Sequence, residues 1–219
     1  MIAAGRGERL RPLTDRWPKP VLPIDGKPVV VSLLHDLAAA GIERFTVVTG
    51  HLAEQVEALA APLPYEIRFA RQPAPDGSLD AVRRAGPEGA FLLAAADTRF
   101  TRGDAARFLA AARGCDGAIA IRRQPGRPDH TRIAVADRRV VRVVAPDADG
   151  GWTAAPLMWF GPGVRAHLDD DVPGPPYEVA SVFQRAIDGG VGVSAIQIGR
   201  TRDLTTSVDL VRENFPYLR

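Results

Sequence analysis

Cysteine is almost absent from this chain, which has a single one, Cys115, among 219 residues. No disulfide can form within the chain, and we expect a reducing, cytoplasmic environment. Long hydrophobic runs are missing too, because no apolar stretch approaches the ~18 residues of a membrane-spanning helix. No signal-peptide pattern is visible either. These absences predict that the protein has no membrane partner.

Charge of one sign does not accumulate anywhere in the chain. The 28 basic and 26 acidic residues leave a net charge of +2, and no long run of like charge occurs. Nucleic acid is therefore not an expected partner, because proteins that bind it concentrate basic residues on one face or tail. Hexapeptide repeats, which would predict an appended β-helix, are absent. The apolar fraction of 46% is ordinary for a globular domain.

Lysine is also scarce, since Lys19 and Lys27 are the only two and every other basic residue is an arginine. Both lysines lie in one block, which begins with a glycine-rich turn at Gly5 and Gly7. Backbone amides in such a turn can hold a triphosphate, and a compact ammonium can neutralise phosphate beside it. The turn is not a dinucleotide fingerprint, because Leu10 occupies the third glycine position. The block therefore predicts phosphate binding.

Helical and strand patterns alternate after this block, and three closely spaced strand-like segments occupy the second half. This order predicts an α/β fold, a Rossmann-like three-layer sandwich with a mixed, mainly parallel sheet and a small antiparallel subregion on the acceptor side. A turn is expected at 147–151. The expected helices span 29–40, 52–60, 78–85, 104–113, 178–188 and 207–214, and the expected strands span 43–49, 65–71, 90–96, 116–122, 132–136, 139–144, 152–160 and 192–198.

The first strand is expected to be unusual, because only Met1 to Ala4 precede Gly5. A strand of this kind usually has about five or six residues. We expect either that the strand is cut short, which would weaken the sheet beneath the site, or that the true start lies upstream of Met1.

The block from Ala3 to Pro28 resembles the signature of the sugar-1-phosphate nucleotidylyltransferases, also called nucleotide-sugar pyrophosphorylases. That signature reads A-A-G-x-G-x-R-L-x-P-L-T, then P-K-P, then G-K-P, and the chain has each part in order. The resemblance implies Mg²⁺-dependent transfer of a nucleotidyl group from an NTP, with UTP or dTTP favoured, to a sugar 1-phosphate. It implies one nucleotidyltransferase domain over 1–219, with a nucleotide-binding half (1–115) and an acceptor-binding half (116–219).

The same resemblance implies roles for individual residues. Arg9 would clamp the triphosphate, and Lys19 would hold the phosphate of the acceptor, as the two catalytic cations. Asp97, at the end of an apolar strand, and Asp203 would hold the Mg²⁺, which prefers few carboxylates and several waters. The residues expected to bind the nucleotide are Ala4, Gly5, Gly7, Gln72 and Gly77.

Several other polar residues have structural interpretations. The segment Gly26-Lys27-Pro28 is expected to form a turn that leads into the following helix, and Asp209 is expected to be structural. The histidines show no metal-ligand spacing and are expected to be structural or solvent-facing: His35, His51, His130 and His167.

The resemblance weakens downstream of the first block, where Ala96, Thr201 and Thr205 replace residues of the family's motifs. Ala145-Pro146-Asp147 stands where the family has E-K-P, whose Glu binds sugar hydroxyls. The acceptor therefore stays open. One alternative is a cytidylyl- or other nucleotidyltransferase that acts on a non-sugar alcohol phosphate. The other is a non-catalytic, nucleotide-sensing subunit with the same fold.

Overall fold

The computed structural model describes residues 1–123, 131–144, 151–215 and 217. Three parallel strands stand in the order β1, β4, β5, and six further strands form a mixed sheet in the order β6, β11, β8, β12, β10, β9. The strands are β1 (Ile2–Ala3), β4 (Arg44–Thr49), β5 (Glu66–Arg71), β6 (Phe91–Ala94), β8 (Gly117–Arg123), β9 (Ala134–Ala136), β10 (Arg139–Arg142), β11 (Trp152–Phe160) and β12 (Val193–Gln197).

The two sets of strands meet between β1 and the end of β6. Ile2 and Ala95 form a parallel bridge, and the amide of Ala96 donates to the Ile2 carbonyl over 2.8 Å. Since β11 is antiparallel to both β6 and β8, and β12 is parallel to β8, the strands β1, β4, β5, β6, β8 and β12 all point the same way. Their carboxyl ends therefore lie at one edge of the sheet.

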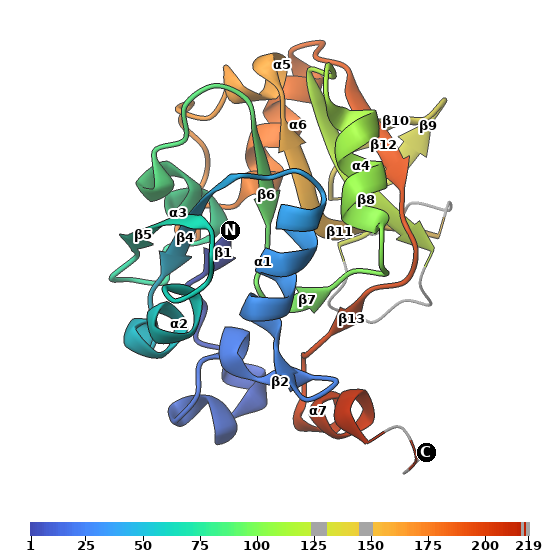
Figure 1. Cartoon of the computed structure of the whole chain (residues 1–219). Helices are drawn as coiled ribbons and strands as arrows, with labels where there is room; N and C mark the ends of the chain where they lie inside the picture. The colour runs from blue at the N-terminus through green and yellow to red at the C-terminus, as the bar shows by residue number, and fades with distance from the viewer. Residues whose placement is uncertain (124–130, 145–150, 216, 218–219) are drawn as a thin grey trace.

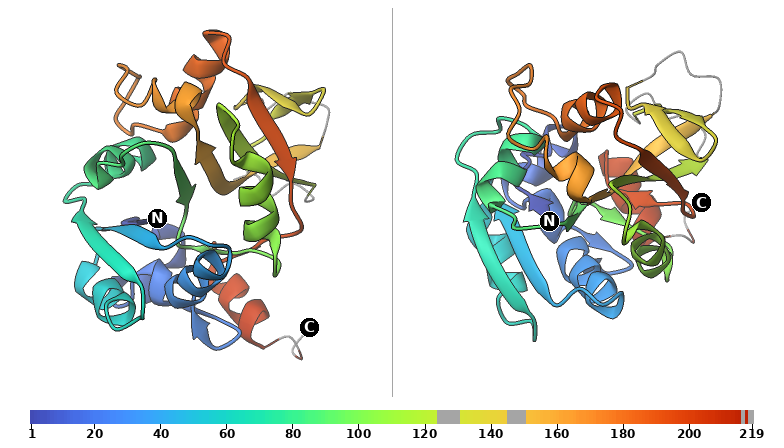
Figure 2. Two further views of the ribbon diagram at one scale, coloured as in Figure 1. Left: turned by 45° about the horizontal axis from the view of Figure 1, so that its top comes forward. Right: turned by 90° about the horizontal axis from the view of Figure 1, so that it is seen from above.

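Helices cover both faces of this sheet (Figures 1 and 2). The apolar faces of α1, α2 and α4 pack on one side, where Leu33 and Phe108 are fully buried. The other side is covered by α3, α5 and α6, around Phe160 and Phe183. These helices are α1 (Val29–Ala39), α2 (Ala53–Ala60), α3 (Ser78–Ala85), α4 (Asp104–Ala112), α5 (Pro162–Arg165) and α6 (Val179–Asp188).

Short elements gather at the carboxyl edge of the sheet, the lower part of Figure 1. A small apolar cluster that includes Leu10, Ile24 and Leu204 lies among them. The elements are the 3₁₀ turns η1 (Glu8–Leu10), η2 (Leu13–Asp15) and η3 (Lys19–Val21), the hairpin β2 (Pro23–Ile24) and β3 (Lys27–Pro28), the two-stranded ladder β7 (Thr98–Arg99) and β13 (Arg202–Asp203), and α7 (Ser207–Asn214).

The predicted α/β fold with a mainly parallel sheet is confirmed, and every predicted helix and strand is present. The first strand has two residues, and the segment predicted as a strand at 132–136 is ordered as a strand only over Ala134–Ala136. The expected turn at 147–151 lies, apart from Gly151, outside the described residues. The 3₁₀ turns, α5, β7 and β13 were not predicted, because two to four residues show no periodicity. None of the helices formed by the described residues is both long and apolar enough to cross a bilayer.

Candidate active site

A short antiparallel ladder brings together two acidic residues that lie far apart in the sequence. Asp97 lies three residues after the end of β6, and the next residue, Thr98, pairs with Asp203 where β7 meets β13. The amide of Leu204 also reaches the Asp97 carbonyl, over 3.5 Å. Both carboxylates therefore lie at the carboxyl edge of the sheet, where ligands bind in open α/β folds.

The Thr98 hydroxyl lies between the two carboxylates. It is 3.0 Å from Oδ1 of Asp97 and 2.7 Å from Oδ1 of Asp203, and Thr98 is only 1% exposed. Because a hydroxyl carries one proton, it can donate to one carboxylate at a time. The Thr201 hydroxyl donates to the other oxygen of Asp203 over 2.9 Å. Two anionic groups are thus held close together by neutral donors.

A cation lies beside each of these carboxylates. Lys19 Nζ is 2.6 Å from Oδ2 of Asp97, and the prolines on both sides of Lys19 restrict the backbone that carries it. Arg122, near the end of β8 and 3% exposed, places Nη1 3.3 Å from Oδ2 of Asp203. The expected triphosphate clamp, Arg9, is exposed on η1, which follows the glycine turn.

The glycine turn has a backbone that only glycine accepts easily. Gly7 has φ 63°, and a Cβ there would lie 2.9 Å from Cγ2 of Thr14. The Thr14 hydroxyl donates back to the Gly7 carbonyl over 3.0 Å, and His51 Nε2–H donates to the Thr14 carbonyl over 2.6 Å. A Cβ on Gly5 would meet no atom within 4 Å, so Gly5 borders open space. Ala4 is buried beneath the turn.

The carboxamide of Gln72 is largely occupied by hydrogen bonds within the protein. It follows β5, is 7% exposed, and its carboxamide nitrogen donates to the Gly77 carbonyl over 2.9 Å and to the Asp80 carboxylate over 2.8 Å. Burial alone would raise the pKa of Asp80, but hydrogen bonds from Arg84 and Gln72 hold that pKa below its ordinary value. Both N–H donors are thus engaged, which leaves the carboxamide oxygen as the atom that Gln72 can offer a ligand.

Gly77 is held against the segment that precedes α6. It has φ 102°, and a Cβ there would lie 2.2 Å from the Tyr177 carbonyl oxygen. The Tyr177 amide donates to the Asp76 carbonyl over 2.7 Å, and the Leu79 amide donates to the Tyr177 carbonyl over 2.8 Å. The Ser78 hydroxyl adds a hydrogen bond to the Glu178 carboxylate. The predicted nucleotide-binding half and acceptor-binding half therefore meet at Gly77.

Hydrogen bonds from Arg202 fix the strand that carries Asp203. Arg202 donates to both carboxylate oxygens of Asp25, over 2.5 and 2.8 Å, and to Glu213 of α7. The hydrogen bond from Arg202 lowers the pKa of Asp25. Asp25 lies in the turn between β2 and β3, so the hydrogen bonds of Arg202 join the lysine-containing block to the C-terminal helix α7. Of the turn expected over Gly26-Lys27-Pro28, only Gly26 lies in a turn, whereas Lys27, which is exposed, and Pro28 form the short strand β3 that leads into α1.

The residues expected to be structural have structural contacts. Asp209 accepts hydrogen bonds from the Thr206 amide and hydroxyl in a capping box that begins α7. His35 contacts the Tyr65 hydroxyl at 2.6 Å, and His167 contacts the Asp170 carboxylate at 2.8 Å. His130 lies outside the described residues.

The acidic pair suits a hard divalent cation. Carboxylate oxygens are the ligands that Mg²⁺ prefers, and it usually keeps only one or two of them together with water and substrate phosphate. Within the described ranges, no group of three or more His, Cys, Asp or Glu residues could hold a metal. A cation held by Asp97 and Asp203 would therefore take its remaining ligands from phosphate oxygens and water.

Sequence reasoning missed Thr98 and Arg122, which contact the two acidic residues. A usable signal existed for Arg122, because it is a charged residue near the end of an apolar strand, as Asp97 is. Thr98 had none beyond its position next to Asp97, since its contact with Asp203 depends on β13.

Residues 1–158 match the model of the MobA-like NTP transferase domain. The chain belongs to this family. Among solved structures, it is similar to the inositol-1-phosphate CTP transferase of T. maritima (TM-score 0.79, 18% identity, 95% of this chain and 89% of that chain). It is also similar to a putative glucose-1-phosphate thymidylyltransferase of Bacillus anthracis (TM-score 0.82, 17% identity, 97% and 92%). Both likenesses show the nucleotidyltransferase fold.

Curated relatives of the family match the chain in sequence. The N-acetylmuramate alpha-1-phosphate uridylyltransferase of Neisseria meningitidis is 42% identical over 81 residues, 36% of this chain and 35% of that protein. The bifunctional protein GlmU of Acidovorax ebreus is 28% identical over 221 residues, 91% and 46%. A 2-aminoethylphosphonate cytidylyltransferase of Lancefieldella rimae is 44% identical over 55 residues, 25% and 22%. The chain covers less than half the length of each of these relatives.

Proposed function

We propose that the chain transfers a nucleotidyl group from an NTP, with UTP or dTTP favoured, to a sugar 1-phosphate, and releases pyrophosphate. The observation that carries this proposal is the meeting of Asp97 and Asp203 at the Thr98 hydroxyl, with Lys19 alongside. Its location at the carboxyl edge of the sheet and the family of the chain support it. The single cysteine supports a cytoplasmic location.

The proposed reaction joins two polyanions. A phosphate oxygen of the acceptor bonds to the α-phosphorus of the NTP, and the bond from that phosphorus to the bridging oxygen of the β-phosphate breaks. The electron pair leaves with pyrophosphate. Because the attacking phosphate is already ionised, no side chain has to remove a proton, and positioning and charge neutralisation supply the acceleration.

In this proposal, different residues of the chain bind the triphosphate, the acceptor phosphate and the metal ion. Amides of the turn at Gly5 and Gly7 bind phosphate oxygens, and Arg9 provides a planar guanidinium for the triphosphate. Lys19, whose Nζ already reaches the acidic pair, holds the phosphate of the acceptor and lowers its repulsion from the α-phosphate. Asp97 and Asp203 hold Mg²⁺ in this proposal. When bound, this ion would neutralise charge on the α-phosphate and on the leaving pyrophosphate.

A second candidate keeps the transfer and changes the acceptor. Cytidylyl transfer to a non-sugar alcohol phosphate or a phosphonate is favoured by the match to the L. rimae cytidylyltransferase. The sequence Ala145-Pro146-Asp147 in place of E-K-P also favours it, since the family's Glu binds sugar hydroxyls.

Pyrophosphate release tests these proposals. Purified protein and Mg²⁺ are incubated with each of the four NTPs and dTTP against sugar 1-phosphates, alcohol phosphates and phosphonates. Release with UTP or dTTP and a sugar 1-phosphate supports the first candidate, and release with CTP and a non-sugar acceptor supports the second. Tight nucleotide binding with no release for any acceptor would support a nucleotide-sensing subunit and refute both.

Asp97→Asn tests the metal assignment. The change should abolish turnover and weaken Mg²⁺ binding to the NTP-loaded protein while leaving the circular dichroism spectrum unchanged. Asp169→Asn is the matched control, because that carboxylate is 80% exposed and lies outside the site. Full activity of Asp97→Asn would overturn the assignment.

Lys19→Ala tests the role of the lysine. The KM for the acceptor should rise more than the KM for the NTP, because Lys19 is assigned to the acceptor phosphate. Lys27→Ala removes the only other lysine, which is exposed on β3, and should change neither value. A larger effect of Lys19→Ala on the NTP would show that its role is misassigned.

A further inference from the structure

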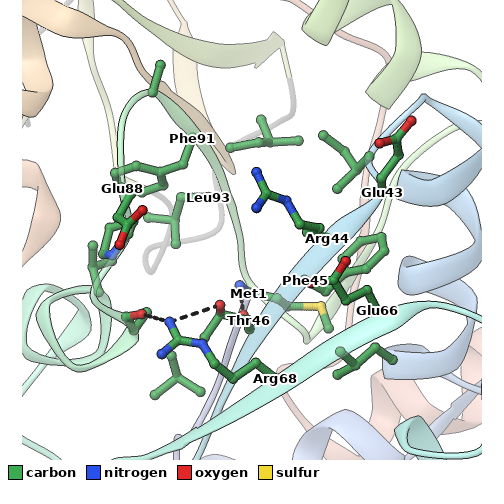
Figure 3. Close-up of a pocket in the computed structure, with 18 of the residues that line it drawn as sticks. Met1, Glu43, Arg44, Phe45, Thr46, Glu66, Arg68, Glu88, Phe91 and Leu93 are labelled. Carbon is green, nitrogen blue, oxygen red and sulfur yellow. Dashed lines mark hydrogen bonds between the residues drawn. The ribbon is translucent and has the colours of Figure 1, made fainter.

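The pocket in Figure 3 lies away from the candidate active site. It opens at the amino ends of β4 and β6, where Arg44 and Phe91 lie, and none of the residues assigned above to nucleotide, acceptor or metal lines it. The acidic pair and the glycine turn lie at the carboxyl edge of the sheet, so groups at that edge must select the nucleotide base. Gln72, which follows β5, can distinguish one base from another, because a carboxamide has a donor end and an acceptor end.

Gln72 lies beside the glycine turn that follows Ala4. The Gln72 amide donates to the Thr49 carbonyl over 2.8 Å. A Cβ on Gly50 would lie 2.8 Å from the Ala4 carbonyl oxygen and 2.9 Å from the Gln72 carbonyl oxygen, so the backbones of these three residues are close together. Gln72 and the turn that is assigned to phosphate therefore border the same part of the site.

The neighbours of the Gln72 carboxamide decide which way it is turned. Its nitrogen lies 2.9 Å from the Gly77 carbonyl oxygen and 2.8 Å from Oδ2 of Asp80. Burial alone would raise the pKa of Asp80, but hydrogen bonds from Arg84 and Gln72 hold that pKa below its ordinary value, so the side chain is an anion at neutral pH. Because a carbonyl and a carboxylate can only accept hydrogen bonds, a reversed carboxamide would bring its oxygen against two other oxygens.

Asp80 is itself fixed by its own helix. Arg84 lies one turn later on α3, and its Nε donates to the same Oδ2 of Asp80 over 2.6 Å. Asp80 also lies in the first turn of α3, where the helix dipole favours an anion. The acceptor that faces Gln72 is therefore held in place by the protein alone, before any nucleotide binds.

The carboxamide oxygen of Gln72 is left for the nucleotide. Within the part of the chain that the structure describes, this oxygen accepts no hydrogen bond, and it is not among the buried side-chain atoms that lack a partner, so a ligand can reach it. Uracil and thymine have an N–H at ring position N3, which this oxygen can accept. Cytosine has a lone pair at N3, which the oxygen would repel, and its N–H donors are on the exocyclic amine.

We propose that Asp80 is a positioning residue for base selection: it keeps the Gln72 nitrogen engaged and the oxygen turned to the nucleotide, so that the site selects UTP or dTTP over CTP. This inference rests on the proposed function and on the expected contact of Gln72 with the nucleotide. A carboxamide free to reverse could meet N3 of uracil with its oxygen or N3 of cytosine with its nitrogen. Asp80 removes the second choice, because reversal would set the Gln72 oxygen against the carboxylate.

Isothermal titration calorimetry with Mg²⁺ and no acceptor tests the proposal. The unaltered chain should bind UTP at least about tenfold more tightly than CTP. It should also bind UTP at least about tenfold more tightly than N3-methylated UTP, which has no N–H at that position. Asp80→Ala should bring the affinities for UTP and CTP to within about threefold of each other, because one N–H of Gln72 is released and the carboxamide can turn.

Two further variants are matched controls. Asp80→Asn supplies a carboxamide oxygen that Arg84 can hold in the place of Oδ2, so the preference for UTP should stay within about twofold of its original value. Asp76→Ala removes a carboxylate of the same loop that does not contact Gln72, and it should leave the preference unchanged. A ratio of two affinities does not depend on how much of the protein is folded, so a loss of stability cannot imitate the effect of Asp80→Ala.

Several results would overturn the proposal. Equal affinity for UTP and N3-methylated UTP would show that the Gln72 oxygen does not meet N3. Equal weakening of UTP and CTP by Asp80→Ala, or a loss of preference in Asp80→Asn as large as in Asp80→Ala, would show that Asp80 does not act by orienting the carboxamide.

Two outcomes separate this inference from the proposed function. Binding of CTP as tight as that of UTP, or tighter, would refute the inference while nucleotidyl transfer from CTP to a non-sugar acceptor would stand. Binding of no NTP at all would refute the proposed function and the inference together.

Discussion

The amino group of Met1 should make the stability of the chain depend on pH. Burial lowers the pKa of this group from 8.0 to about 5. Between these values the unfolded chain binds a proton that the folded chain does not, so the free energy of unfolding rises with pH. The stabilisation is complete above pH 8 and is lost as the pH falls towards 5.

The size of this effect follows from the pKa. A lowering of about three units corresponds to roughly 4 kcal/mol between pH 8 and pH 5, at about 1.4 kcal/mol per unit. This is a large fraction of the ~5–15 kcal/mol that stabilises a typical domain. Urea denaturation at half-unit intervals from pH 5 to pH 8 measures it directly.

A chain that carries Gly-Ser-Gly before Met1 is the control, because its Met1 nitrogen is an amide that cannot titrate. Every side chain of the protein is the same in both chains, so the difference between the two pH profiles isolates the Met1 amine. The unextended chain should lose roughly 4 kcal/mol more free energy of unfolding than the control as the pH falls from 8 to 5. Superimposable profiles would refute the reasoning.

Three further changes test the candidate site. Thr98→Val removes the hydroxyl shared by two carboxylates while keeping the shape of the side chain. The free energy of unfolding in urea should fall by about 1–3 kcal/mol, and the Mg²⁺ concentration needed for half-maximal turnover should rise. An unchanged Mg²⁺ requirement would contradict the site. Arg122→Met removes the buried cation beside the Asp203 carboxylate and should lower the free energy of unfolding by about 3–5 kcal/mol. Arg122→Lys keeps the charge and should lower it by less. Equal losses for the two variants would mean that charge is irrelevant at this position. Gly77→Ala should lower the free energy of unfolding by more than about 2 kcal/mol, because residue 77 has φ 102° and the new Cβ would lie 2.2 Å from a backbone atom. Gly86→Ala is the control, with φ 54° and open space around the Cβ, and should lower it by about 1 kcal/mol. Similar losses for the two variants would argue against the clash at Gly77.

The sequence alone determined the local structure of this protein. Apolar residues at helical spacing on α1 and the alternation along β5 predicted those elements, because burial of one face requires that spacing in any fold. The glycines of the first block predicted the turn at Gly5 and Gly7 for a similar local reason. The family assignment also rests on this block and on the residues that follow it.

Tertiary structure alone decided which of the singled-out residues meet. Asp97 and Asp203 were each predicted as metal ligands, and that role stays a prediction, but their shared contact with Thr98 depends on the pairing of β7 with β13. Two-residue strands have no sequence pattern that states their partner. The contact of Arg122 with Asp203 likewise depends on the order of strands across the sheet. Periodicity records which face of an element is buried, whereas the neighbour of that element is chosen by the packing of the whole chain.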